Sequence, residues 1–266
     1  YQARNLDMGP VDLFRSLVFN AVFERGGREV FRAQMMAGYM MVVTGAKFSG
    51  SDGFALARNT RYPDQPGGNA EMLHSLKTGV PLQGWTLRKI LETENSYDAA
   101  VAAISRSPFA SAEYVLVSGV RKGVVLSMNP SGVAHTQVLG GHHNFEQPPD
   151  YVIVSNFDFF WGDMREWFDP TAGGGFGRPS RRVAAQRILN SSMHTGITAE
   201  VLWNTISAPY VLATSKGDAT IFQAVINVEK RFWNTSIPII SQAPPEDVGP
   251  NDASPKASVS SGSLHG

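Results

Sequence analysis

The sequence lacks cysteine in all of its 266 residues. These residues therefore offer no disulfide, no thiolate metal ligand and no cysteine nucleophile. An excess of one charge is also missing: 23 basic and 23 acidic residues give a formal net charge of +0 at pH 7. No overall field then attracts nucleic acid, and we expect no such partner. Glycine and lysine interrupt the most apolar stretch, residues 35–48, so no run reaches the roughly 20 residues of a membrane span.

What the sequence does contain is typical of a globular domain. Hydrophobic residues make up 42% of the chain, which suits a large core. We predict one domain over residues 1–238, followed by a disordered Pro/Ser/Gly-rich tail at 239–266. The first residue is Tyr1 rather than Met, and residues 1–7 read as the later part of a strand. We therefore expect that the sequence lacks an N-terminal piece, so a signal peptide could not show itself.

Residue patterns predict short strands interrupted by paired helices. Ser96 or Asn95 is expected to cap the second helix, with Asp98 in its first turn. This arrangement, without strict βαβ alternation, favours an α+β fold with an antiparallel sheet. Strands are predicted at 30–38, 39–45, 54–62 (half-buried), 112–120, 123–130, 151–160 and 220–229, and helices at 86–94, 96–105, 181–192 and 198–207.

The first candidate site pairs Arg4 with Asp7 near the N-terminus. In a regular strand these two side chains would leave opposite faces, so we expect them to share a site only if the strand ends or turns between them. Residues 8–10, Met-Gly-Pro, can supply that turn. The alternative is an ordinary structural ion pair.

Two further candidates are polar residues at the ends of apolar elements. Asn156 and Asp158 follow an apolar run, and an Asn side chain can donate to a developing oxyanion, although both residues also suit a plain turn. Arg181 and Arg182 open a predicted helix, where cations oppose the helix dipole. An inward Arg182 paired with a buried carboxylate would resolve that conflict, and a solvated pair is the alternative.

Six motifs in the same order resemble acid ceramidases and N-acylethanolamine-hydrolysing acid amidases. The resemblance covers residues 1–238. The motifs are RNLD at 4–7, GYMMVVTG at 38–45, LETENSYDAAV at 91–101, VSGVRKGVVLSMN at 117–129, SNFD at 155–158 and RR at 181–182.

The resemblance implies an N-terminal nucleophile hydrolase with an αββα sandwich. Such enzymes mature by autocleavage, which exposes a cysteine whose thiol attacks an amide while its own α-amine accepts the proton. By the resemblance, that cysteine precedes Tyr1, Arg4 lies beside it and Asp7 orients its amine. Asn156 forms the oxyanion hole, and Arg182, with Arg181 as the adjacent alternative, holds the catalytic end. No cofactor is implied.

Two features depart from the family pattern. Thr60 stands before Arg61 where the family has Glu, and a hydroxyl cannot replace that charge, so substrate positioning or proenzyme switching would differ. Residues 159–179 are longer and more aromatic than expected. Three of them, Phe159, Phe160 and Trp161, are predicted to bind substrate as part of a lipid-facing lip that contacts a membrane surface, with core packing as the alternative.

Three other features of the sequence are weaker evidence for a function. His135, His142 and His143 lack the supporting ligands of a metal site, so we predict none. Residues 173–178, GGGFGR, lack the ending of a phosphate loop. Asn190 and Asn234 begin glycosylation sequons, which would suit a lysosomal or secreted protein.

The main hypothesis is hydrolysis of a fatty-acyl amide, ceramide or an N-acylethanolamine, through a cysteine thioester in the full-length protein. An N-terminal propeptide subunit is the implied partner. Residues 1–266 alone would bind acyl amides without cleaving them. A non-catalytic lipid-binding relative is the runner-up, and a bile-salt or penicillin-type amidase is a third reading.

Overall fold

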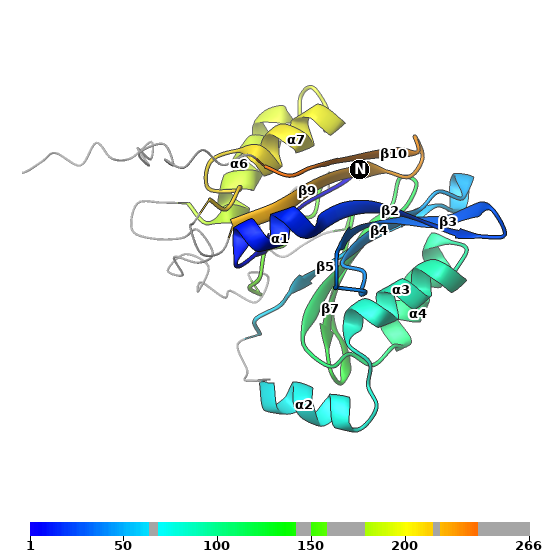
Figure 1. Ribbon diagram of the computed structural model, residues 1–266. Helices are drawn as coiled ribbons and strands as arrows, with labels where there is room; N and C mark the ends of the chain where they lie inside the picture. The colour runs from blue at the N-terminus through cyan, green and yellow to red at the C-terminus, as the bar shows by residue number, and fades with distance from the viewer. Residues whose placement is uncertain (64–68, 142–149, 159–178, 215–218, 239–266) are drawn as a thin grey trace, which may run out of the picture.

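The computed structural model describes residues 1–63, 69–141, 150–158, 179–214 and 219–238, and Figure 1 shows its helices and strands. The predicted tail at 239–266 lies outside the described residues. The strands are β1 (Gln2–Met8), β2 (Val18–Arg25), β3 (Arg28–Met36), β4 (Thr44–Lys47), β5 (Phe54–Thr60), β6 (Glu113–Ser118), β7 (Gly123–Asn129), β8 (Gly132–Val138), β9 (Ala219–Asn227) and β10 (Phe232–Ser236). The helices are α1 (Val11–Leu17), a 3-10 turn (Gly50–Asp52), α2 (Asn69–Lys77), α3 (Gln83–Thr93), α4 (Tyr97–Arg106), α6 (Arg181–Ser192) and α7 (Ala199–Ser207).

The strands form two sheets. Seven strands follow one another in the order β2 to β8, and a three-stranded sheet has the order β1-β9-β10. Every strand pair within the described residues is antiparallel, which confirms the prediction from the sequence. Neighbours along the chain pair in the larger sheet, and α2, α3 and α4 lie in the connection between β5 and β6. In contrast, β1 and β9 meet across more than 200 residues. That long-range pairing brings the N-terminal motif beside the last part of the domain.

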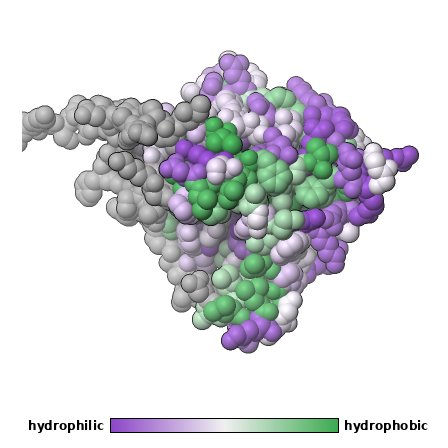
Figure 2. All heavy atoms as spheres, viewed as in Figure 1, coloured by the Kyte–Doolittle hydropathy of each residue, from purple (hydrophilic) through white to green (hydrophobic). Residues whose placement is uncertain are grey.

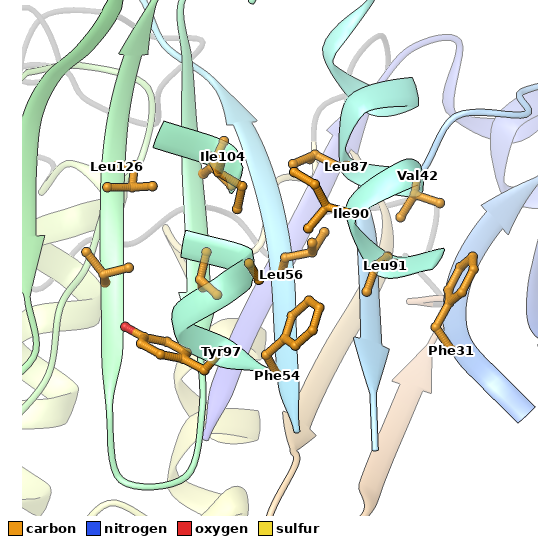
Figure 3. Close-up of a cluster of buried hydrophobic side chains, with 14 of the residues drawn as sticks. Phe31, Val42, Phe54, Leu56, Leu87, Ile90, Leu91, Tyr97, Ile104 and Leu126 are labelled. Atoms are coloured by element: carbon orange, nitrogen blue, oxygen red, sulfur yellow. The ribbon is translucent and has the colours of Figure 1, made fainter. Parts of the chain in front are cut away.

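The main hydrophobic core lies between the larger sheet and the helices α3 and α4. Figure 3 shows Leu87 and Ile90 of α3 and Ile104 of α4 above side chains of the sheet, including Phe54 and Leu56. The Ser96 side chain accepts from the backbone N–H of Ala99, so it caps α4 as predicted. Apolar residues at helical spacing on α3 and α4 pack on the larger sheet, so these helices and this sheet form the first two layers of the fold.

The second pair of layers is the three-stranded sheet with α6 and α7. Helix α7 packs against both β1 and β9, and α6 packs against α7. Between the sheets, Ala46 and Ala55 of the larger sheet contact Ala224 and Ile226 of β9. The order of layers is thus helix, sheet, sheet, helix, as visible in Figure 1.

Three strand predictions need correction. Only Thr44 and Gly45 of the predicted strand 39–45 belong to β4, because residues 39–43 follow the turn closed by the Met36–Tyr39 bridge. Residues 151–158 contain no strand, and Phe157 makes only an isolated parallel bridge with Tyr62. β5 is buried on both faces over Phe54–Ala57 rather than half-buried, because helices cover one face and the second sheet the other.

Apolar side chains also reach the surface. Figure 2 shows hydrophobic residues over α2 and around α1, where Leu73 and Leu13 are more than half exposed, at 53% and 54%. No helix among the described residues is long and apolar enough to cross a membrane.

Candidate active site

A cavity of about 500 Å³ surrounds the free edge of β1. Within the described ranges β1 pairs only with β9, and its other edge lines this space. The inner face of the larger sheet at β5 to β7, residues 150–157, and helices α6 and α7 close it. Five of the predicted site residues line the cavity: Arg4, Asp7, Thr60, Asn156 and Arg182.

Arg4 lies between the two sheets and is 5% exposed. Its Nη1 donates to the Val43 carbonyl at 2.9 Å and to Thr44 Oγ1 at 2.8 Å. No carboxylate forms an ion pair with it among the described residues, and its buried Nε has no hydrogen-bond partner there. Burial, followed by the nearby charge of Arg58, lowers the pKa of Arg4 to about 9. Arg4 is therefore a cation held largely by neutral oxygen atoms, beside a cavity.

Asp7 leaves the opposite face of β1. Its Oδ1 accepts from Thr220 Oγ1 at 2.6 Å, and its Oδ2 forms an ion pair with Arg181. β1 remains extended through Met8, with a register irregularity between Leu6 and Asp7, so no turn separates the two motif residues. The expectation that a shared site requires such a turn is wrong, because the cavity wraps around the strand edge and reaches both faces.

The two arginines at the start of α6 have different partners. Ser180 caps the helix through the N–H of Val183. Arg181 pairs with Asp7, which offsets the unfavourable position of a cation at a helix start. Arg182 donates to Gln186 at 3.2 Å within the helix. Both line the cavity, but the contact with Asp7 belongs to the residue that the sequence reading kept as its alternative.

Asn156 is tied to the end of β5. Its Nδ2 donates to the Thr60 carbonyl at 2.8 Å, and its own carbonyl accepts from the Tyr62 N–H at 2.7 Å. Thr60 is exposed and lies directly opposite Glu113 of β6. The amide predicted as an oxyanion donor and the residue that departs from the family pattern are thus neighbours at one wall of the cavity.

The sequence patterns did not predict two buried ion pairs. Arg58 pairs with Glu113 at 2.9 Å, and Arg61 pairs with Asp158 at 2.7 Å. Burial raises the pKa of the Glu113 carboxyl, while Arg58 opposes that shift. The partners are separated by 55 and 97 residues, so local patterns carry no signal of the pairing. The only available hint was Asp158 two residues after Asn156.

The described residues do not include every residue predicted for the site. Phe159, Phe160 and Trp161 lie outside the described residues, as do His142 and His143. His135 lies in β8. Within the part of the chain that the structure describes, no three His, Cys, Asp or Glu side chains gather as metal ligands would.

Curated proteins similar to this chain fall into two groups. No family model matches the sequence. Acid ceramidase of Balaenoptera acutorostrata scammoni is 25% identical over 88% of this chain and 57% of its own length. Human acid ceramidase is 25% identical over 83% of the chain and 51% of its own length. N-acylethanolamine-hydrolyzing acid amidase of Caenorhabditis elegans is 29% identical over 58% of the chain and 42% of its own length.

The chain is a homologue of these two amidases. It spans about half the length of the curated relatives that it matches. A solved structure of a Caenorhabditis elegans N-acylethanolamine-hydrolyzing acid amidase ortholog matches with a TM-score of 0.67 and 23% identity, over 89% of this chain and 94% of that one. The likeness establishes the fold, an αββα sandwich with antiparallel sheets, as the resemblance implied.

Proposed function

We propose that the full-length protein hydrolyses the amide bond of a fatty-acyl lipid, either ceramide or an N-acylethanolamine. The observation that carries this proposal is a cavity in which a polar group of residues adjoins an apolar lining. Arg4, Asp7, Asn156 and the α6 arginines are the polar part. The apolar part includes Val125, Leu139, Val152, Val154, Leu189 and Ile206. An acyl chain with a polar amide at one end likewise has an apolar part and a polar part, which match the two parts of the cavity.

The cavity reaches Tyr1 at the start of β1, which supports the placement of the nucleophile. We assign it to a cysteine N-terminal to Tyr1, on the earlier part of the strand that β1 continues, as the resemblance implies. The thiol would lose its proton to the cysteine's own α-amine and attack the amide carbonyl. The α-ammonium would pass this proton to the departing nitrogen as the C–N bond breaks, which releases the amine product and leaves a thioester. Water would then cleave the thioester to the free fatty acid and restore the thiol.

The described residues supply three roles in this reaction. Asp7, held by Thr220 and Arg181, orients the cysteine amine. Asn156 donates to the oxyanion. Arg4 keeps a positive charge next to the position of the nucleophile, where it favours a thiolate. Arg181 holds Asp7, and Arg182 holds the neighbouring wall. Thr60 lies where substrate enters this polar end and contributes no charge.

The remaining parts of the proposal come from the sequence patterns and from the resemblance. Residues 1–238 form the amidase domain, and the predicted tail at 239–266 lies outside the described residues. An N-terminal propeptide subunit, autocleavage, glycosylation at Asn190 or Asn234, and a lysosomal or secreted location complete it. Phe159, Phe160 and Trp161 bind substrate at the lip and contact a membrane surface. Residues 1–266 alone hold the site without its nucleophile and are proposed to be inactive.

A lipid-binding relative without catalysis is the second candidate. It is favoured by the absence of cysteine in these residues and by Thr60, which supplies no carboxylate.

The test uses the complete reading frame, including the segment before Tyr1. Fatty-acid release from ceramide and from an N-acylethanolamine is measured for the natural protein and for a variant with the upstream cysteine changed to Ala. We expect release from at least one substrate and its loss in the variant. Lys89→Ala, an exposed change on α3, is the control and retains release. Equal release by the cysteine variant overturns the mechanism, and lipid binding without release supports the second candidate.

A further inference from the structure

A short parallel pairing holds Asn156 at the cavity. Residues 60–62, which end and follow β5, run beside residues 156–158. The Tyr62 N–H donates to the Asn156 carbonyl at 2.7 Å, and Tyr62 and Phe157 form a parallel bridge. Their rings are 5.6 Å apart between centroids. A backbone bridge and a ring contact thus connect these segments, and both involve Tyr62, which is 51% exposed.

The buried side of this pairing is an ion pair. Arg61 Nε and Nη2 donate to the two carboxylate oxygens of Asp158, each at 2.7 Å, and both side chains are 1% exposed. Arg61 Nη1 also donates to Asn129 Oδ1 at 2.5 Å, and the Tyr114 hydroxyl donates to Asp158. A bidentate pair fixes both distance and orientation of its partners. The network therefore fixes residue 158 to β5, β6 and β7 of the larger sheet.

This arrangement determines which way the Asn156 amide is turned. The Thr60 carbonyl can only accept a hydrogen bond, so it selects the nitrogen of the amide, Nδ2, at 2.8 Å. An amide nitrogen carries two N–H groups. One is used by Thr60, and the second has no partner among the described residues, although Asn156 lines the cavity. If residues 156–158 shifted in register along residues 60–62, the Thr60 carbonyl would no longer accept from Nδ2 and would no longer fix the orientation of the amide.

We propose that the Arg61–Asp158 ion pair is a positioning device that presents the second N–H of Asn156 to the substrate in the cavity. The inference rests on the proposed role of Asn156 as oxyanion donor. Neither Arg61 nor Asp158 lines the cavity, so neither contacts substrate. Both act through Asn156: the buried pair keeps the two segments in register, and the Thr60 carbonyl then orients the amide. An energetic benefit that exists only when the oxyanion forms should appear in kcat rather than KM.

The kinetic test is a double-mutant cycle in the full-length protein. Asp158→Asn keeps the shape of the side chain but places an amide against Arg61. We expect Asn156→Ala to lower kcat by about 100-fold and Asp158→Asn to lower it by about tenfold or more, each with little change in KM. Since Asp158 acts through Asn156, adding Asp158→Asn to Asn156→Ala should cause almost no further loss. Multiplying losses would overturn the proposal.

A matched control and a readout without catalysis complete the test. Glu29→Gln breaks a bidentate Arg–carboxylate pair at the surface, with Arg32, and should leave kcat unchanged. In the same proteins, labelled with 15N-asparagine, the side-chain amide signal of Asn156 should shift and broaden in Asp158→Asn but not in Glu29→Gln. An unchanged signal overturns the positioning role even if the natural protein cleaves neither lipid. Absence of cleavage with a shifted signal would refute the proposed function alone.

Discussion

The two faces of the larger sheet differ in what they bury. The face under α3 and α4 buries a continuous apolar cluster that includes Phe31, Phe54 and Leu126, and only at its end do Arg58 and Glu113 pair. The face toward the smaller sheet and the cavity carries buried polar side chains. These are Gln34, Thr44, Ser127 and Gln137, with Gln2 and Arg4 of β1 facing them. Burying polar groups costs free energy unless they are hydrogen-bonded, so one face is suited to stability and the other to a site.

The largest expected effect is on the helical face. Phe54 is fully buried in the apolar cluster, and Phe54→Ala should lower the free energy of unfolding by about 3–5 kcal/mol, because it removes buried area and leaves a cavity. Urea unfolding measures this loss. In protein that remains folded, we expect hydrolysis to be little changed. A loss of activity without a loss of stability would contradict the division between the faces.

The next effect concerns the site and compares two adjacent residues. Arg181→Ala removes the partner of Asp7 and should lower kcat/KM by about 10- to 100-fold, because a hydrogen bond to a charged group contributes about 1.5–3 kcal/mol. Arg182→Ala should cost less, since Asp7 keeps its partner. The comparison uses the full-length protein and both lipid substrates. A larger loss in Arg182→Ala would favour Arg182, the first choice made from the sequence.

The difference between the two faces also explains what the sequence could predict. Helices α4 and α6 and strand β9 follow from local patterns, because each buries an apolar stripe or run. The segment 151–158 has the apolar residues of a strand but lines the cavity and pairs with residue 62 only at one bridge. One of its apolar residues, Ile153, packs against a cluster that includes Ala184 and Ala185 of α6. The conformation of this segment depends on tertiary contacts, which hydrophobic periodicity and strand propensity do not encode.

The site shows the same limit. Arg4, Asp7 and Asn156 were found through motifs in a known order, and Thr60 was found as a departure from the family pattern. The structure brings all four to one cavity. The choice between Arg181 and Arg182 could not be made from the sequence, because adjacent helical residues differ by only about 100° in direction. The pairing of Arg61 with Asp158 could not be predicted for another reason. The two residues are 97 positions apart in the sequence, and only the folded sheet brings them together.

A smaller effect is expected from the polar face. The Ser127 hydroxyl is fully buried and has no hydrogen-bond partner among the described residues. Ser127→Ala should therefore raise the free energy of unfolding by about 1 kcal/mol, because it removes an unsatisfied polar group. Leu126→Ala on the other face of the same strand is the opposing control and should destabilise by about 2–5 kcal/mol. Destabilisation by Ser127→Ala would mean that the hydroxyl has a ligand or water to bind.

The smallest effect tests the end of the sheet where the two faces meet. Thr60 and Glu113 are direct cross-strand partners, so Thr60→Glu would place two carboxylates side by side. Like charges at that spacing should lower the free energy of unfolding by about 0.2–1 kcal/mol near neutral pH. Burial already raises the pKa of Glu113, and the new charge would raise it further, so Glu113 takes up its proton first as the pH falls.

The sign of the pH dependence then separates charge from shape. Repulsion requires both carboxylates to be ionised, so the penalty of Thr60→Glu should shrink as the pH falls toward the pKa of Glu113. Thr60→Gln has the same size without the charge and should show no such trend. Urea unfolding of both variants at pH 7 and pH 4.5 makes the comparison. A penalty that is equal at both pH values would show that shape, and not the missing carboxylate, decides which residue this position accepts.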